Sequence, residues 1–289
     1  MEAEFNLGYS PERLSPGVEG QGLRDVKKIV SGDTDETLAE LSTLYGMVVD
    51  AGVYEAPSIE TAEAAKVTEN VQRDVNIALV NELSIICDHL DIETSEVLDA
   101  AGTKWNFHDY RPGLVGGHCI PVDPLYLAHG AERAGYSPNL VLTSREVNEY
   151  MPKHAAEHVL RALNESGKVL QESRVLVLGL AYKPNVGDVR TSEIGGVITE
   201  LESYRLDVLG HDPHVPTDAA REEFGIDVVD DLEFDGYDGV ILATAHDAYA
   251  DLDVETMADV MNDDPVMLDI MGAVDGDAAV DAGFEYRTL

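Results

Sequence analysis

The run Arg174-Val175-Leu176-Val177-Leu178-Gly179 decides the fold class of this chain. A short apolar run that ends in glycine is typical of a strand buried on both faces of a parallel sheet. Similar runs follow at 207–210, 239–244 and 265–269, with helical sequence between them, the first helix being expected to start at a Thr191-Ser192 cap. Strands that alternate with helices predict an α/β class, with a doubly wound, Rossmann-like parallel sheet over residues 167–289.

Residues 58–166, which precede this sheet, have a helical pattern. Val67, Val71, Val75 and Ala78 recur at the spacing of one helix face, so a long helix is expected from about 58 to 89. Further helices are expected at 94–101, 125–134 and 144–166, with Pro152 marking a helix start or a kink. This segment is therefore predicted to be a central α-helical domain.

Residues 1–57 are expected to be the remnant of another α/β domain. Strand-like pieces occur at 5–9 and 28–32, and a helical stretch at about 38–45. The glycine-rich run at 17–22 follows a turn and is interpreted as a flexible loop. No G-x-G-x-x-G fingerprint follows any predicted strand, so this part resembles the end of an α/β unit that lacks its beginning.

The composition narrows the function class. Nineteen basic residues, seven of them lysine, oppose 56 acidic residues and give a formal charge of −37. Such a surface repels nucleic acid and anionic lipid, and it favours adaptation to high salt, where screening weakens the self-repulsion. Two cysteines in 289 residues indicate a reducing compartment, and no apolar run is long enough to span a bilayer. A soluble, cytoplasmic protein is expected.

Cys119 lies in the run Gly116-Gly117-His118-Cys119-Ile120-Pro121-Val122-Asp123-Pro124. Glycines before a thiol and a carboxylate after it favour a presented nucleophile, although an inert thiol is the commoner case and a Cys-His hydrolase pair stays open. Cys87 is different, because it shares a helix face with apolar residues and is expected in the core. The two cysteines lack metal-ligand spacing, so no metal site is expected.

The few basic residues gather in motif-like segments. Lys66, Asn70 and Arg73 lie at i, i+4 and i+7 and could donate to an oxyanion or phosphate, or simply form a solvated helix face. The segment 10–14 pairs Glu12 with Arg13, either at a site or in a turn with a surface ion pair. The segment 178–190, directly after the first quoted strand, fits an anion site at the carboxyl edge of a sheet.

Together these segments resemble the UDP-glucose/GDP-mannose dehydrogenase family, and within it the UDP-N-acetyl-hexosamine 6-dehydrogenases of surface-polysaccharide synthesis. The matching motifs run in family order across nearly the whole chain: YSPER at 9–13, EAAKVTENVQRD at 63–74, KWNF at 104–107, RPGLVGGHC at 111–119, GLAYK at 179–183 and DVR at 188–190.

The resemblance implies three parts: a remnant of an NAD-binding Rossmann domain at 1–57, a helical dimerisation domain at 58–166 and a UDP-sugar-binding domain at 167–289. It also implies a homodimer that oxidises the C6 alcohol of a UDP-N-acetyl-hexosamine or UDP-glucose to a carboxylate. Two hydrides pass to NAD, and the intermediate is a thioester on cysteine.

The resemblance also assigns roles to single residues. Cys119 matches the nucleophile, Lys66 and Asn70 the oxyanion donors, Asp123 a carboxylate that assists proton transfer, and Glu12 the base for the hydrolytic water. The remaining matches are ligand contacts: Arg13, Leu14, Arg73, Gly116, Tyr182, Lys183 and Arg287 for the substrate, and Arg190 for NAD. Family members take a basic residue from the neighbouring subunit where this chain has Thr103 and Trp105; either Lys104 or Arg111 substitutes, or the contact is absent.

The family's Rossmann fingerprint is expected ahead of Phe5, where this sequence has only four residues. The expectation is a truncated gene product, a misassigned start, or a separate NAD-binding polypeptide that supplies the missing half. The primary hypothesis is a nucleotide-sugar 6-dehydrogenase fragment. The alternatives are a non-catalytic UDP-sugar-binding or subunit-interaction protein and a cysteine-dependent hydrolase.

Overall fold

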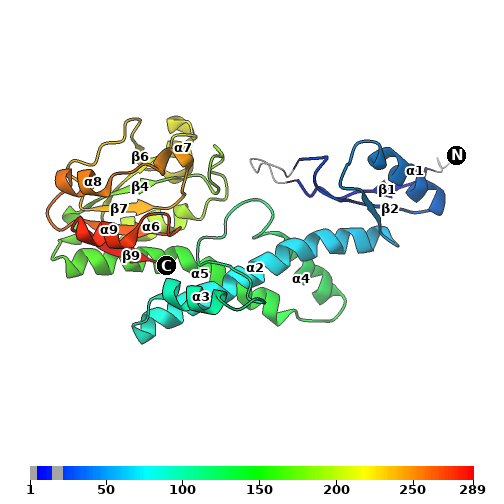
Figure 1. Ribbon diagram of the computed structural model, residues 1–289, viewed down its shortest axis with the longest axis horizontal. Coiled ribbons are helices and arrows are strands. Elements are labelled where there is room, and N and C mark those ends of the chain that lie inside the picture. Colours follow the sequence, from blue (N-terminus) through cyan, green and yellow to red (C-terminus); the bar gives the residue numbers. More distant parts are fainter. Residues whose placement is uncertain (1–4, 15–21) are drawn as a thin grey trace. The chain divides into compact units, whose positions relative to one another are not determined.

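The computed structural model describes residues 5–14 and 22–289, and the chain divides into two compact units, 1–72 and 73–289 (Figure 1). The boundary falls within the long helix α2 (Ile59–Leu90). All but the last residue of the glycine-rich run at 17–22 lie outside the described residues.

The first unit is a small sheet with one helix packed on it. Its elements before α2 are β1 (Gly8–Tyr9), β2 (Lys28–Gly32), α1 (Asp35–Gly46) and β3 (Val53–Glu55). Strand β2 lies in the middle, with β1 antiparallel and β3 parallel to it. Helix α1 begins where the Thr34 hydroxyl accepts the N–H of Thr37, and acidic residues in its first turn complement the helix dipole.

The second unit begins with helices, as the sequence predicts. They are the rest of α2, α3 (Thr94–Gly102), α4 (Asp123–Arg133) and α5 (Asn139–Glu165). Pro152 lies inside α5 and does not mark its start. Cys87 is buried, which confirms its predicted place in the core.

A six-stranded, wholly parallel sheet follows, which confirms the predicted fold class. Its strands are β4 (Arg174–Leu178), β5 (Asp207–His211), β6 (Asp227–Val228), β7 (Gly239–Leu242), β8 (Val266–Asp269) and β9 (Glu285–Thr288), in the order β6-β5-β4-β7-β8-β9. The connecting helices are η1 (Leu170–Glu172), α6 (Ile194–Ser203), α7 (Thr217–Phe224), η2 (Asp247–Tyr249), α8 (Val254–Val260) and α9 (Gly276–Asp281). Strands β6 and β9 are absent from the sequence-based prediction.

Successive residues of β4 enter different cores, because strand side chains alternate between faces. Val175 and Val177 pack with residues of α5 and α6, whereas Leu176 and Leu178 pack with residues of α8 and α9. The chain moves outward from β4 to β6 and then returns to β7, so the strand order reverses between β4 and β7. In such sheets, ligands bind at the carboxyl ends of the strands that flank this switch point.

The predicted cap of α6 is wrong. The helix begins at Ile194 behind Glu193, with no side-chain capping bond. Thr191 has φ 59°, and its carbonyl accepts the N–H of Gly117 at 3.0 Å. Thr191 therefore serves a contact with the cysteine loop. Across the described residues, every helix is too short or too polar to cross a membrane.

Candidate active site

The cysteine loop joins α3 to α4 and exposes Cys119. The carbonyl of Cys119 accepts the N–H groups of Val122 and Asp123 at 3.1 and 2.9 Å, which forms a turn into α4. Asp123 is the first residue of that helix, and Pro124 suits its first turn because it has no N–H to satisfy. No hydrogen bond links Cys119 to a histidine in the described part of the chain.

Two glycines let this loop approach the loop after β4. A Cβ on Gly116 would lie 2.7 Å from the carbonyl oxygen of Thr191 and 3.3 Å from the Cβ of Tyr182. Gly117 has φ +96°, and a Cβ there would lie 3.1 Å from the Tyr182 ring. The structure therefore brings Gly116 and Tyr182 into contact and explains both glycines by packing.

His118 links the same two loops through a carboxylate. Its Nε2 lies 3.2 Å from the Asp188 Oδ2, and its ring meets Tyr182 edge-on with centroids 6.0 Å apart. Asp188 also accepts two bonds from the Arg190 guanidinium, at 2.9 and 3.0 Å. The Arg190 hydrogen bond lowers the pKa of Asp188 most, and the bond from His118 adds to this, so that the pKa lies well below its usual range despite the opposing effect of burial.

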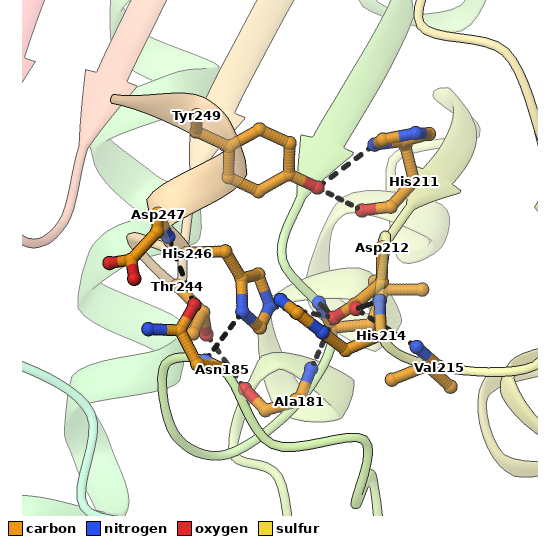
Figure 2. Close-up of polar contacts among 11 residues, drawn as sticks. Ala181, Asn185, His211, Asp212, His214, Val215, Thr244, His246, Asp247 and Tyr249 are labelled. Atoms are coloured by element: carbon orange, nitrogen blue, oxygen red, sulfur yellow. Dashed lines mark hydrogen bonds and ion pairs between the residues drawn. The ribbon is translucent and has the colours of Figure 1, made fainter. Parts of the chain in front are cut away.

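The buried carboxylate of Asp212, at the end of β5, holds the loop after β4 in place (Figure 2). Its Oδ2 accepts the N–H groups of Leu180 and Ala181 at 2.8 and 3.0 Å, and its Oδ1 accepts those of His214 and Val215. Burial alone raises the pKa of Asp212, but these bonds and that from His246 outweigh it and lower the pKa to about 2.

His246 links Asp212 to Asn185, in the middle of the loop after β4 (Figure 2). Its Nδ1 accepts the N–H of Asn185 at 2.8 Å, so its proton is on Nε2, which lies 3.1 Å from the Asp212 Oδ2. Asn185 needs the support, because its φ is 59°, in the left-handed region. Neither Asp212 nor His246 was predicted from the sequence. The available signal for Asp212 was a carboxylate directly after a buried strand.

A pocket opens at the switch point of the sheet. Tyr182 follows β4, Thr244 follows β7, and both line it together with Gly116 and Glu193. Burial raises the pKa of Glu193. The pocket thus lies where a doubly wound sheet binds ligands, and the cysteine loop forms one of its walls.

In the first unit, Glu12 and Arg13 form a compact loop ahead of β2. The Glu12 carboxylate accepts the N–H groups of Leu14 and Arg13, both at 2.7 Å. The bond from Leu14 lowers the Glu12 pKa most, and the charges of Lys28 and Lys66 act in the same direction. Arg13 forms an ion pair with Glu69 of α2 at 2.6 Å. The structure therefore brings Glu12, Arg13 and Lys66 into one charged neighbourhood.

Lys28 is a further member of this group that the motifs missed. It is buried, its Nζ donates to the Pro11 carbonyl at 2.9 Å, and it lies over the Tyr45 ring. Burial of a lysine ammonium costs free energy unless a partner compensates it, and here the Pro11 carbonyl does so. Through this bond Lys28 positions the 10–14 loop. Its place within a strand-like run hid it from the motif comparison.

The other predicted residues are placed as follows. Asn70 is buried on α2, Arg73 is exposed, and Leu14 and Lys183 are half-buried. Arg287 lies on β9 and pairs with Glu165 and Glu285, both at 2.6 Å, and it does not line the switch-point pocket. Lys66, Asn70 and Glu12 belong to the first unit, whereas Arg73, Cys119 and Asp123 belong to the second.

Two family models match the chain. Residues 60–150 match the central domain of the UDP-glucose/GDP-mannose dehydrogenase family, and residues 176–276 match its UDP binding domain. Protein CapL of Staphylococcus aureus is 45% identical over 277 residues, which is 95% of this chain and 64% of that protein. A UDP-N-acetyl-D-glucosamine 6-dehydrogenase of Salmonella typhi is 43% identical over 92% of this chain and 63% of its own length.

Solved structures of nucleotide-sugar dehydrogenases also resemble the fold of this chain. The structure of a UDP-D-ManNAc dehydrogenase from Pyrococcus horikoshii matches with a TM-score of 0.86 and 27% identity, covering all of this chain and 65% of that one. The chain thus spans a little under two thirds of the relatives it matches. By sequence and by fold, it belongs to the UDP-glucose/GDP-mannose dehydrogenase family.

Proposed function

We propose that this chain contributes the catalytic cysteine and the UDP-sugar site of an NAD-dependent nucleotide-sugar 6-dehydrogenase. Its substrate is a UDP-N-acetyl-hexosamine, or UDP-glucose, and its product serves surface-polysaccharide synthesis. The observation that carries the proposal is an exposed thiol on a loop that packs against the ligand-binding edge of a parallel sheet. The similarity to a 6-dehydrogenase over 92% of the chain supports the reaction class.

In this proposal the Cys119 thiolate adds to the C6 aldehyde formed by the first oxidation. Lys66 and Asn70 stabilise the negative oxygen, and Asp123 assists the proton transfer at the thiol. Loss of a second hydride, which NAD⁺ held by the completed enzyme would accept, gives a thioester, and water deprotonated by Glu12 hydrolyses it to a carboxylate and free thiol. Hydrogen bonds lower the Glu12 pKa, so this base is ionised at neutral pH.

Arg13, Leu14, Arg73, Gly116, Tyr182, Lys183 and Arg287 are the proposed substrate contacts. The arginine and lysine side chains among them can form ion pairs with the diphosphate of a UDP-sugar. We divide the chain at 57/58 and 166/167 into the end of an NAD-binding domain, a helical dimerisation domain and a UDP-sugar domain. The two family matches fall inside the second and third parts.

The described residues do not by themselves fit NAD, on which the family depends. Arg190 is the expected contact, but its guanidinium is paired with Asp188. The turn from β2 into α1 carries Asp33, Asp35 and Glu36, and such carboxylates repel a pyrophosphate. We therefore propose that an NAD-binding Rossmann domain outside residues 1–289, whether continuous with this chain or a separate polypeptide, completes the enzyme.

A cytoplasmic homodimer adapted to high salt is also proposed. The charge of −37 supports the salt adaptation. Exposed apolar side chains in the helical part, Trp105 and Tyr126 among them, support a second copy as partner. Sedimentation in molar KCl should give twice the monomer mass of 31.3 kDa. A monomer at micromolar concentration would contradict the dimer.

NADH formation tests the reaction. The chain is mixed with UDP-N-acetylglucosamine, its galactose epimer or UDP-glucose in molar salt, alone and with a co-expressed NAD-binding domain of the family. Two NADH per sugar are expected, and Cys119→Ala should abolish product formation while the buried-cysteine control Cys87→Ala retains it. UDP-sugar binding without turnover in either mixture would favour a non-catalytic protein, and ester hydrolysis without NAD would favour a hydrolase.

A further inference from the structure

A polar seam joins the two long helices of the second unit. On α2, Asp74, Asn81 and Asp88 lie seven residues apart, a spacing that returns to the same helix face. Their partners on α5 follow in the same order along the chain, so the two helices run parallel at this seam (Figure 1).

The first two layers of the seam match donors with acceptors. Asp74 Oδ1 accepts Arg145 Nη1 at 2.6 Å and Asn148 Nδ2 at 2.8 Å. In the next layer, Asn81 Nδ2 donates to Asn148 Oδ1 at 2.9 Å, and Asn81 Oδ1 accepts the N–H of Gly113. The negative charge of Asp74 is thus balanced by a guanidinium.

The third layer differs. His154 and His158 lie one turn apart on α5, and their side chains are 7% and 6% exposed. Their Nε2 atoms lie 2.9 and 2.7 Å from the same oxygen, Asp88 Oδ2, and 3.2 Å from each other. Three possible ligand atoms therefore converge on one point from two helices.

In this layer two imidazole nitrogens face the same carboxylate oxygen, whereas the Asp74 oxygen of the first layer faces a guanidinium and an amide. Ligands bonded at about 2.0–2.2 Å to one ion in a tetrahedral arrangement lie about 3.3–3.6 Å apart. The nitrogen–nitrogen distance of 3.2 Å is close to this, and the two nitrogen–oxygen distances of 2.7 and 2.9 Å must open by roughly half an ångström when an ion enters.

We propose that Asp88, His154 and His158 bind one zinc ion that ties α2 to α5. Two imidazoles and one carboxylate are a ligand set for zinc and also for Fe(II), whereas Mg²⁺ and Ca²⁺ prefer oxygen ligands alone. Zinc needs only four ligands in a tetrahedral arrangement, and these three side chains with one water supply them. A water molecule completes the coordination.

The proposed site differs from the sequence-based expectation of no metal, because that expectation considered the spacing of the two cysteines alone. His154 and His158 form an H-x-x-x-H pair on one helix, whereas Asp88 lies 70 residues before His158 in the sequence. The ion would stabilise the helical region that carries the cysteine loop, because anything that binds only the folded state raises its stability.

The test uses the full chain after chelator treatment, in molar NaCl with millimolar Mg²⁺ to occupy surface carboxylates. ZnCl₂ should bind at one ion per chain, measured by elemental analysis after gel filtration, and should raise the melting temperature. His154→Gln and His158→Gln keep a hydrogen-bonding side chain and should each weaken zinc binding at least tenfold. His129→Gln, at an exposed histidine of α4, should bind like wild type.

Two further measurements exclude the Cys119 thiol as a zinc ligand and provide a readout that does not depend on the histidine variants. Cys119→Ser should still hold one zinc, which separates this site from the exposed thiol. Co²⁺ added to wild type should give visible bands of nitrogen and oxygen ligation even if the histidine variants fail to fold. Equal zinc uptake and equal thermal shifts in wild type and His158→Gln, or no cobalt spectrum, would mean that the layer is only hydrogen-bonded.

Discussion

A single buried carboxylate, Asp212, joins four backbone N–H groups and one imidazole near the candidate site. Its pKa of about 2 in the folded chain lies below the ordinary 3.8, so the unfolded chain binds more protons between these values. The resulting stabilisation, about 2 kcal/mol, is present above pH 4 and is lost as the pH falls through 2.

Asp212→Asn should therefore lower the free energy of unfolding, with the largest difference from wild type above about pH 5 and a shrinking difference toward pH 2. Urea unfolding at several pH values measures this. Asp218→Asn, at a fully exposed carboxylate, is the control and should follow wild type. A difference that stays constant with pH would contradict the role of the ionised carboxylate.

The glycine pair of the cysteine loop gives a second residue-level prediction. Gly116→Ala places a methyl group 2.7 Å from the Thr191 carbonyl, so the two loops must separate. We expect a loss of UDP-sugar affinity of tenfold or more, measured by calorimetry, with a small change in stability. Gly113→Ala is the matched control in the same loop, because nothing lies within 4 Å of its added Cβ. Equal affinities in the two variants would refute the packing role.

At the scale of elements, the α2–α5 seam contains a buried ion pair. Arg145 and Asp74 have side chains 4% and 0% exposed. Removing one partner of a buried pair leaves an unbalanced charge, so Arg145→Met should cost about 3–5 kcal/mol in chemical denaturation. Glu149→Gln removes a 58%-exposed partner of the same arginine and should change stability by less than about 0.5 kcal/mol. The double variant Asp74→Leu/Arg145→Met should recover part of the loss.

The elements that the sequence predicted are those with long or strongly apolar patterns. Helix α2 and strands β4, β5, β7 and β8 were expected where the structure has them. Strands β3, β6 and β9 were missed because they are short or polar, so their local pattern is weak and pairing with a neighbouring strand decides their conformation. The start of α6 was misplaced because Thr191 serves the contact with Gly117 and caps nothing.

For the whole molecule, the formal charge of −37 dominates the response to salt. Screening shortens the Debye length from about 10 Å at 0.1 M to about 3 Å at 1 M salt. The melting temperature should therefore rise with KCl, with most of the increase below 1 M, in a calorimetric series. A protein that is most stable in dilute buffer would contradict both this prediction and the proposed adaptation to high salt.

The sequence by itself determined the fold class, the exposed cysteine loop and the family, because these depend on local periodicity and on motifs that stay contiguous in the chain. Only the tertiary structure decided which distant groups meet: His118 with Asp188, Asp212 with the loop after β4, Lys28 with Pro11, and Asp88 with two histidines of α5. The physical reason is that each of these contacts joins residues widely separated in the chain. Such pairs are set by strand order and helix packing, and no local pattern records them.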